Sequence, residues 1–154
     1  MIAIGSDHGG FGLKQAIIGY LQAKGIPYVD KGCFSKAACD YPEYGRAVAY
    51  AVAGGQCEKG IVVCTTGIGI SITANKVKGI RCALCGDSLS AKLTRLHNDA
   101  NVLALGGGVI GENLAVEIVD TFLRTEFSNE EKHIRRIAGL ETDNLSLPYT
   151  KREE

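Results

Sequence analysis

Side chains capable of acid–base chemistry stand directly after short apolar runs in this sequence. Cys64 ends the apolar run 60–64, and Thr65 and Thr66 follow it in a glycine-rich turn. A helix N-terminus stabilises a thiolate, and a row of free backbone N–H groups stabilises an oxyanion. The stretch therefore predicts an activated thiol beside an oxyanion site. The alternative is that Cys64 is a buried structural thiol, the usual place of a cysteine considered alone.

A second pair of such residues, Asp7 and His8, follows the N-terminal apolar run 2–5 and precedes a helical pattern. Aspartate is favoured at the start of a helix, so Asp7 can be a simple N-cap. In the functional alternative, His8 and the first amides of the helix face an anion while Asp7 polarises a hydroxyl group. Both alternatives place the pair at the end of a strand.

A third candidate, His97, stands between a helical pattern and the last apolar run. A helix of about ten residues spans roughly 15 Å and returns the chain to the amino edge of a parallel sheet. His97 should therefore lie far from Cys64 in the same chain. Either His97 is structural, or it serves the site of a partner subunit. The second alternative predicts a homodimer whose active site lies at the interface.

Strand-like and helical patterns alternate along the chain and must position these residues. Strands are expected at 2–5, 26–30, 60–64, 80–85 and 101–105, and helices at 11–23, 42–52, 88–96, 112–124 and 129–137, with a short helix ending at 77. Parallel strands need helical crossovers that cover both faces of the sheet. The pattern therefore predicts an α/β fold, a three-layer α/β/α sandwich with a five-stranded parallel sheet. In such sheets ligands bind outside the carboxyl ends of the strands.

Composition excludes several classes of protein. The 17 basic and 17 acidic residues cancel, so the chain lacks the positive field that binds nucleic acid or acidic membranes nonspecifically. No apolar run approaches the roughly 20 residues of a membrane span, and the N-terminus lacks a secretory signal. We expect a cytoplasmic protein forming one domain over residues 1–154, with a polar tail at 144–154 and reduced cysteines. Cys82 and Cys85 are expected as small core residues, because positions three apart on a strand face opposite sides.

Six segments taken together resemble the ribose-5-phosphate isomerase B family, and the match extends from residue 1 to about 138. They are Ser6–Gly10, Asp40–Pro42, Cys64–Ser71, Ala74–Lys76, Gly79–Arg81 and His97–Asp99. The resemblance implies a flavodoxin-like or Rossmann-like sandwich and a homodimer with a shared active site, without metal or cofactor. Whether such dimers pair into a dimer of dimers is left open. The implied reaction interconverts ribose 5-phosphate and ribulose 5-phosphate in pentose-phosphate metabolism.

The resemblance also implies roles for individual residues. Cys64 would be the base that moves a proton between C1 and C2 through an enediolate, with Thr66 assisting. Backbone amides of the loop would hold the oxyanion. His97, with Asp7 nearby, would open the sugar ring. The implied substrate and phosphate contacts are Asp7, His8, Tyr41, Thr65, Thr66, Gly67, Ile68, Gly69, Asn98, Lys132 and Arg136.

Three residues depart from the pattern of the family. Thr65 stands where glycine is usual, Lys132 where arginine is common, and Gly108 where many relatives carry an arginine that reaches the phosphate. Lysine keeps the charge but loses the bidentate fork of arginine. Without the resemblance, Lys132 and Arg136 would be part of a solvated charged helix face. His133, beside Lys132, is either a surface group or a substrate contact.

Two alternative functions remain. Galactose-6-phosphate and allose-6-phosphate isomerases share the fold and the glycine loop, and the missing arginine at Gly108 could reflect a phosphate shifted by a longer sugar. Cys64 and His97 together favour the pentose. A phosphosugar-binding protein without catalysis would keep the pocket, but it would have no use for a base and a ring-opening histidine.

Overall fold

The computed structural model describes residues 1–141, so the tail predicted at 144–154 lies outside the described residues. Strands and helices alternate as the sequence predicts. The strands are β1 (Ile2–Ser6), β2 (Tyr28–Asp30), β3 (Lys59–Cys64), β4 (Cys82–Leu84) and β5 (Val102–Gly106). The helices are α1 (Phe11–Ala23), α2 (Tyr41–Ala53), α3 (Ile68–Asn75), α4 (Ser88–Asn98), α5 (Glu112–Arg124) and α6 (Glu131–Leu140). Within residues 1–141, no helix has the length and apolar character needed to cross a membrane.

The five strands form one parallel sheet in the order β2-β1-β3-β5-β4. The strand order reverses next to β1, because the chain first moves outward to β2 and then returns to β3 on the other side. Ligands of open α/β sheets bind at such a reversal, outside the carboxyl ends of the strands. Asp7 follows β1 and Cys64 ends β3, so both residues lie at this point.

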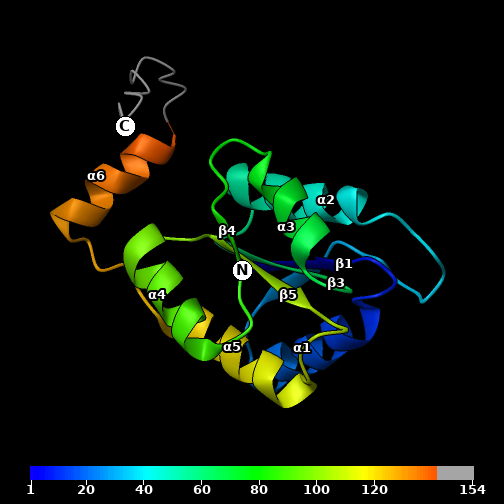
Figure 1. Cartoon of the computed structure of the whole chain (residues 1–154). Coiled ribbons are helices and arrows are strands. Elements are labelled where there is room, and N and C mark those ends of the chain that lie inside the picture. The colour runs from blue at the N-terminus through cyan, green and yellow to red at the C-terminus, as the bar shows by residue number, and fades with distance from the viewer. Residues whose placement is uncertain (142–154) are drawn as a thin grey trace, which may run out of the picture.

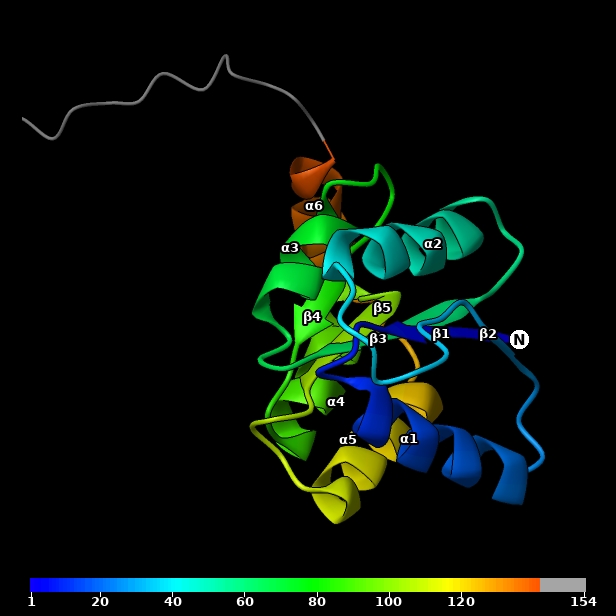
Figure 2. The same cartoon turned by 90° about the vertical axis from the view of Figure 1, so that its right-hand side faces the viewer.

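Helices cover both faces of the sheet, which confirms the predicted α/β/α sandwich. Helices α2 and α3 lie on one face, and α1, α4 and α5 lie on the other (Figures 1 and 2). Successive side chains of a strand point to opposite faces. Accordingly Ile61 and Val63 of β3 join the core under α1 and α5, while Val62 and Cys64 join the core under α2 and α3. Helix α6 lies outside these layers, beside the end of α4 (Figure 1).

Several element boundaries differ from the predicted ones. The two outer strands are shorter than predicted, at 28–30 and 82–84, because an edge strand has a neighbour on one side only. Helix α4 extends to Asn98, so His97 lies in its last turn and not in a loop. Asp99, which adopts a left-handed conformation with φ of 44°, ends that helix.

Cys85 is a core residue as expected, and Cys82 is partly buried against the core. Cys85 belongs to the core under α1 and α5, whereas Cys82 packs against the core on the opposite face. Both are free thiols. Burial raises the pKa of the Cys85 thiol to about 11, which keeps it protonated near neutral pH.

Candidate active site

Cys64 lies at the carboxyl edge of the sheet, where β3 passes into the glycine loop. Its side chain is buried, at 4% exposure, and the Gly67 backbone N–H donates a hydrogen bond to its sulfur at 3.1 Å. The Ile68 N–H donates to Thr66 Oγ1 at 3.2 Å, which closes the turn before α3. Gly67 has a φ of 77°, a conformation that L side chains rarely adopt. The loop therefore curls around the Cys64 thiol and turns a backbone N–H toward it.

The turn after β5 holds this loop from the other side. The Gly107 N–H donates to the Cys64 carbonyl and the Gly108 N–H to the Thr65 carbonyl, each at 2.8 Å. With the carbonyl groups occupied, the orientation of the following peptide planes is set. In the part of the chain that the structure describes, the N–H groups of Thr65 and Thr66 donate no hydrogen bond. They are available to a negatively charged oxygen of a ligand.

Asp7 and His8 lie at the neighbouring strand end. Asp7 is buried, and its Oδ1 accepts a hydrogen bond from the Gly10 N–H at 2.9 Å. The N-cap of α1 is Gly10 and not Asp7, so the alternative of a simple N-cap is wrong. The Asp7 hydrogen bond closes the turn before the helix and occupies one carboxylate oxygen. His8 is exposed, and its Nδ1 lies 3.2 Å from the Cys39 backbone nitrogen and 3.1 Å from the Cys39 carbonyl oxygen. The backbone of Cys39 thus fixes the His8 ring at Nδ1, so Nε2 is the ring nitrogen left for a ligand.

Tyr41 and Thr65 complete the group around Cys64. A Cβ atom at Gly69 would lie 2.5 Å from Tyr41 Cζ, so the Tyr41 ring packs directly on the loop. A Cβ atom at Gly9 would lie 2.1 Å from Thr65 Oγ1, so the Thr65 side chain packs against the segment after β1. One edge of the sheet therefore gathers the following predicted site residues: Asp7, His8, Tyr41, Cys64, Thr65, Thr66, Gly67, Ile68 and Gly69.

The remaining predicted site residues form a second group between α4 and α6. A cavity of about 250 Å³ is lined there by His97, Asn98, His133, Arg136 and two apolar residues of α6. The rings of His97 and His133 are stacked, with centroids 4.4 Å apart and planes 15° apart. Lys132 does not line this cavity, and its ammonium pairs with Glu130 at 2.7 Å. That lysine lowers the pKa of the Glu130 carboxyl.

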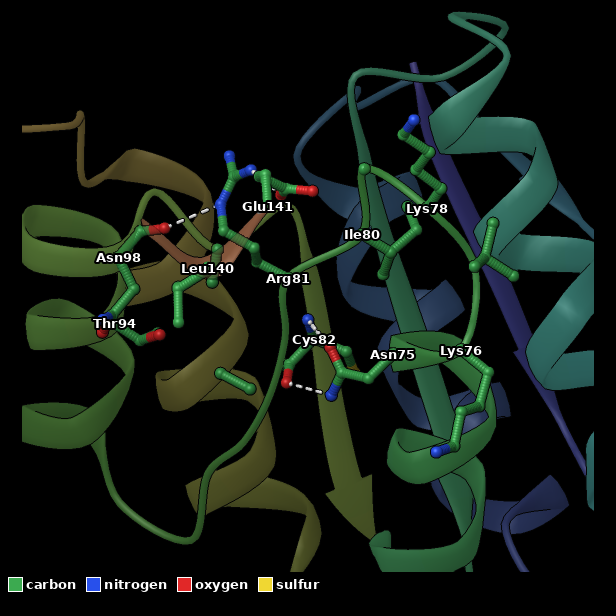
Figure 3. Close-up of a pocket in the computed structure, with 14 residues that line it drawn as sticks. Asn75, Lys76, Lys78, Ile80, Arg81, Cys82, Thr94, Asn98, Leu140 and Glu141 are labelled. Carbon is green, nitrogen blue, oxygen red and sulfur yellow. Dashed lines mark hydrogen bonds and ion pairs between the residues drawn. The ribbon is translucent and has the colours of Figure 1, made fainter. Parts of the chain in front are cut away.

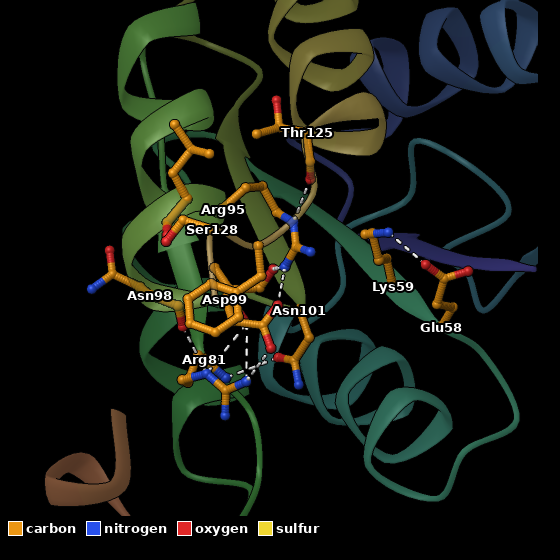
Figure 4. Close-up of polar contacts among 12 residues, drawn as sticks. Glu58, Lys59, Arg81, Arg95, Asn98, Asp99, Asn101, Thr125 and Ser128 are labelled. Atoms are coloured by element: carbon orange, nitrogen blue, oxygen red, sulfur yellow. Dashed lines mark hydrogen bonds and ion pairs between the residues drawn. The ribbon is translucent and has the colours of Figure 1, made fainter. Parts of the chain in front are cut away.

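An arginine and aspartate network fixes the end of α4 beside His97 (Figure 4). The Arg81 Nε donates to the Asn98 carbonyl at 2.9 Å, and its Nη2 donates to the Asp99 carbonyl at 3.0 Å. Arg95 pairs with the Asp99 carboxylate at 2.7 Å and donates to the Thr125 carbonyl at 3.1 Å. Cationic side chains at a helix C-terminus donate hydrogen bonds to its free carbonyl groups and interact favourably with the negative end of the helix dipole.

The two groups lie at opposite ends of the strands of one chain. Cys64 pairs with Gly106 at the carboxyl end of β5, whereas His97 precedes the amino end of the same strand. This placement agrees with the expectation that the helix carries His97 away from Cys64. Each chain therefore presents two partial sites: a thiol with its amide loop, and a histidine cavity with an arginine.

Comparison with known proteins identifies the family. The model of the Ribose/Galactose Isomerase family matches residues 2–140. The chain belongs to this family. It is 47% identical over 139 residues to ribose-5-phosphate isomerase B of Escherichia coli, covering 90% of this chain and 93% of the relative. A galactose-6-phosphate isomerase subunit of Clostridium acetobutylicum is 38% identical over 141 residues, covering 92% of this chain and 82% of the relative.

Solved structures of the isomerase family have the same fold. The structure of ribose-5-phosphate isomerase B from Clostridium thermocellum superposes with a TM-score of 0.89 at 49% identity, covering 91% of this chain and 94% of that one. The predicted α/β class and the resemblance drawn from the sequence segments are thereby confirmed. The roles assigned to individual residues of this isomerase stay predictions, and they depend on the geometry of its two partial sites.

Two supporting residues of this isomerase were not predicted from its sequence. Lys14 is fully buried, and its ammonium donates to both Asp30 carboxylate oxygens at 2.7 Å and to the Cys33 carbonyl at 2.6 Å. It anchors the segment 31–40, which carries Cys39 onto His8. A lysine within a helical pattern gives no signal of burial, because lysine is usually exposed. His133 is the other, and it is buried beside His97.

A further cavity of the isomerase lies away from Cys64. It measures about 590 Å³ and is lined mainly by residues 76–81, between α3 and β4 (Figure 3). The end of α3, β4 and the ends of α4 and α6 supply the rest of the lining. Asn75 closes one side, because its amide exchanges two hydrogen bonds with the Cys82 backbone. Arg81 and Asn98 line the other side. Because it contains no predicted acid or base, this cavity is not the candidate site.

Proposed function

We propose that this chain is a cytoplasmic aldose–ketose isomerase that interconverts ribose 5-phosphate and ribulose 5-phosphate in pentose-phosphate metabolism. The observation that carries the proposal is the Cys64 thiol at the end of β3, with the Gly67 N–H donating to its sulfur at 3.1 Å. A thiolate in this position is stabilised by that N–H and by the start of the following helix. The relative from Escherichia coli, named ribose-5-phosphate isomerase B, supports the choice of substrate.

The proposed reaction has two stages. In the first, the closed sugar ring opens: the C1 hydroxyl loses its proton, the C1–O4 bond breaks and O4 gains a proton, with His97 as the acid–base group and Asp7 nearby. In the second, Cys64 takes the proton from C2, and the oxygen at C1 becomes an enediolate oxyanion. The hydroxyl proton on O2 then passes to O1, the C2 carbonyl forms, and the proton held by Cys64 is returned to C1. The free N–H groups of Thr65 and Thr66 supply fixed donors for that oxyanion.

Phosphate binding is assigned to His8 and Arg136. The free Nε2 of His8 and the guanidinium of Arg136 in the cavity beside His97 are donors of the kind a phosphate needs. Lys132 contributes less, because Glu130 already neutralises its charge. Tyr41 and Asn98 complete the proposed substrate contacts.

We infer that the enzyme is a homodimer, because its two partial sites lie at opposite strand ends of one chain. Five exposed apolar side chains surround β4, the strand at one edge of the sheet: Ile68, Ile72, Leu84, Leu89 and Leu93. An exposed apolar patch beside an uncovered sheet edge is typical of a protein interface. A second copy on this patch would cover it and would bring the His97 group of one chain to the Cys64 group of the other. Pairing of such dimers is left open.

The test is conversion of ribose 5-phosphate to ribulose 5-phosphate without added metal, with allose 6-phosphate assayed in parallel. The Cys64→Ala variant should lose at least about 100-fold in kcat, the usual contribution of a general base. The matched control is Cys57→Ala, which removes another buried cysteine, before the amino end of β3. Equal activity of Cys64→Ala and Cys57→Ala would refute the role of Cys64.

The shared site has its own test. Inactive Cys64→Ala chains mixed with inactive His97→Asn chains should regain activity, because a heterodimer then contains one intact site. Subunit exchange is verified by native mass spectrometry of chains with distinct tags. Exchange without recovered activity would place both residues in the site of one chain.

A hexose 6-phosphate is the second candidate substrate. It is favoured by the relative named as a galactose-6-phosphate isomerase subunit and by Gly108, where no side chain reaches toward a phosphate. Activity on allose 6-phosphate or galactose 6-phosphate, with none on ribose 5-phosphate, would select it. Binding of sugar phosphates without turnover would select the non-catalytic alternative.

A further inference from the structure

Helix α6 buries a histidine where an amphipathic helix normally buries an apolar residue. His133 is 4% exposed, and it is the only buried residue among the ten of α6. The other nine residues of the helix are exposed or half-buried. A surface helix is usually held by a stripe of apolar side chains. The contact of α6 with α4 therefore depends to an unusual degree on one imidazole ring.

The buried ring of His133 gains little from hydrogen bonding. Within residues 1–141, its Nε2 has no hydrogen-bond partner, and the nearest carboxylate oxygen, on Glu130, is 3.9 Å away. Burying a polar nitrogen without a hydrogen bond costs free energy. What the ring does have is the face of His97, at a centroid distance of 4.4 Å and nearly parallel. Stacking on His97 is thus the specific interaction that His133 makes in this buried position.

Burial and the neighbouring charged groups disfavour a protonated His133. Its pKa is lowered first by burial and then by the neighbouring His97, Lys132 and Arg136, against the opposing carboxylate of Glu130. Two stacked imidazoles that were both charged would repel one another in this half-buried position. His97 is half-buried, whereas His133 is buried, so His97 is the member of the pair that solvent or substrate can reach.

No hydrogen bond fixes the His97 ring in the part of the chain that the structure describes, so the stack is the contact that orients it. We propose that His133 is a positioning residue for ring opening: its ring fixes the plane of the His97 imidazole and leaves His97 free to exchange a proton with the sugar. The inference rests on the proposed isomerase function, because it assigns His133 to the ring-opening stage alone. His133 would act through His97 and would leave the proton transfer at Cys64 intact.

The two stages can be measured separately. Ribulose 5-phosphate carries its phosphate on O5 and cannot close to a furanose ring, so exchange of its C1 hydrogen with D2O reports on the enediolate stage without ring opening. Conversion of ribose 5-phosphate requires both stages. The ratio of net conversion to C1 exchange, measured by NMR, therefore reports on ring opening.

Three variants test the proposal: His133→Phe keeps a flat ring for stacking, while His133→Leu and His133→Gln do not. We expect His133→Leu and His133→Gln to lose at least about tenfold in conversion, the size of effect that misplacing a catalytic group produces, while C1 exchange changes less than about threefold. His133→Phe should retain conversion within about threefold of the wild type. Size-exclusion chromatography and circular dichroism confirm that the variants compared are folded dimers.

The proposal would be overturned by equal loss of conversion and exchange in His133→Leu and His133→Gln, since that pattern marks a general structural role. It would also be overturned by unchanged conversion in those variants, or by a His133→Phe variant as slow as His133→Gln. Failure of the proposed function gives a different result, because wild-type protein would then show neither conversion nor exchange. If His133→Leu does not fold, the comparison of His133→Phe with His133→Gln decides the question.

Discussion

The Thr65 methyl group occupies the space that a side chain at Gly108 would enter. A Cβ atom at Gly108 would lie 3.0 Å from Thr65 Cγ2 and 3.2 Å from the Thr65 carbonyl oxygen. The sequence suggested two separate departures from the family, a threonine where glycine is usual and a glycine where arginine is common. The structure shows that the two positions are in contact, so the residue at one position limits the size of the side chain that fits at the other.

The first prediction is that substitutions at these two positions are coupled. Gly108→Arg alone should lower the free energy of unfolding by about 1–3 kcal/mol, because the new side chain overpacks against Thr65. In a Thr65→Gly background the same change should cost less, giving a coupling energy of about 0.5–3 kcal/mol in a double-mutant cycle measured by urea unfolding. Gly111→Arg is the matched control, because nothing lies within 4 Å of a Cβ there. Additive effects would mean that the two sites are independent.

The second prediction concerns Gly67, which turns its N–H toward the Cys64 sulfur. Gly67 has a φ of 77°, and a Cβ there would lie 2.5 Å from Leu84 Cδ1 and 2.8 Å from the Leu105 carbonyl carbon. Gly25 has a φ of 65° with no atom within 4 Å, so Gly25→Ala measures conformational strain alone, about 1–2 kcal/mol.

Gly67→Ala should therefore destabilise the protein by more than Gly25→Ala does, in urea unfolding curves recorded side by side. It should also lower kcat by at least about tenfold, because the loop must move away from the thiol. Gly25 lies after α1, so Gly25→Ala should leave kcat unchanged. Equal losses of stability and unchanged kcat in both variants would show that the loop tolerates a side chain at 67.

The third prediction concerns the apolar patch around β4. Ile72 is 55% exposed on α3, and a glutamate there would place an unpaired charge inside the proposed dimer interface. Ile72→Glu should weaken the dimer at least about tenfold, since an uncompensated charge costs more than about 1.4 kcal/mol in an apolar interface. Analytical ultracentrifugation measures the dissociation constant, and activity should fall in proportion to the dimer lost.

Tyr50→Glu provides the control for that experiment. Tyr50 is 62% exposed on α2, away from the patch that surrounds β4, so its replacement should leave the dimer intact. A dimer equally stable in both variants would show that the chains associate through another surface.

The fourth prediction concerns stability at alkaline pH. Burial, followed by the hydrogen bond to Asp120, raises the pKa of the Tyr20 hydroxyl from 10.0 to about 12. The folded state therefore holds this proton more tightly than the unfolded state does. The resulting contribution to stability is complete below about pH 10 and is lost as the pH rises toward about 12.

Tyr20→Phe should accordingly reduce the dependence of stability on pH in that range, when urea unfolding is compared at pH values on both sides of about 10. Other groups titrate there too, but they do so in both proteins and cancel in the difference. Tyr50→Phe, at an exposed position of α2, is the control. A pH dependence of Tyr20→Phe equal to that of the wild type would contradict the raised pKa.

The sequence by itself determined the order and type of the elements and the position of Cys64 at a strand end. Helices 11–23 and 112–124 have the bounds that the sequence predicted, and the sheet has the predicted five parallel strands. These features depend on local periodicity, which a sequence displays directly. The expected distance of His97 from Cys64 followed from the same logic, because a crossover helix has to return the chain to the amino edge.

Only the tertiary structure decided which residues support the site. Lys14 and His133 occur in helical patterns that carry no signal of burial, yet one is fully buried against Asp30 and the other lies under His97. The contact between Thr65 and Gly108 joins two turns that are far apart in sequence. Such contacts arise from the way separate elements pack, and the packing depends on every side chain between them. For that reason local patterns predicted the order and type of the helices and strands, whereas the packing of the folded chain decided the contacts that support the site.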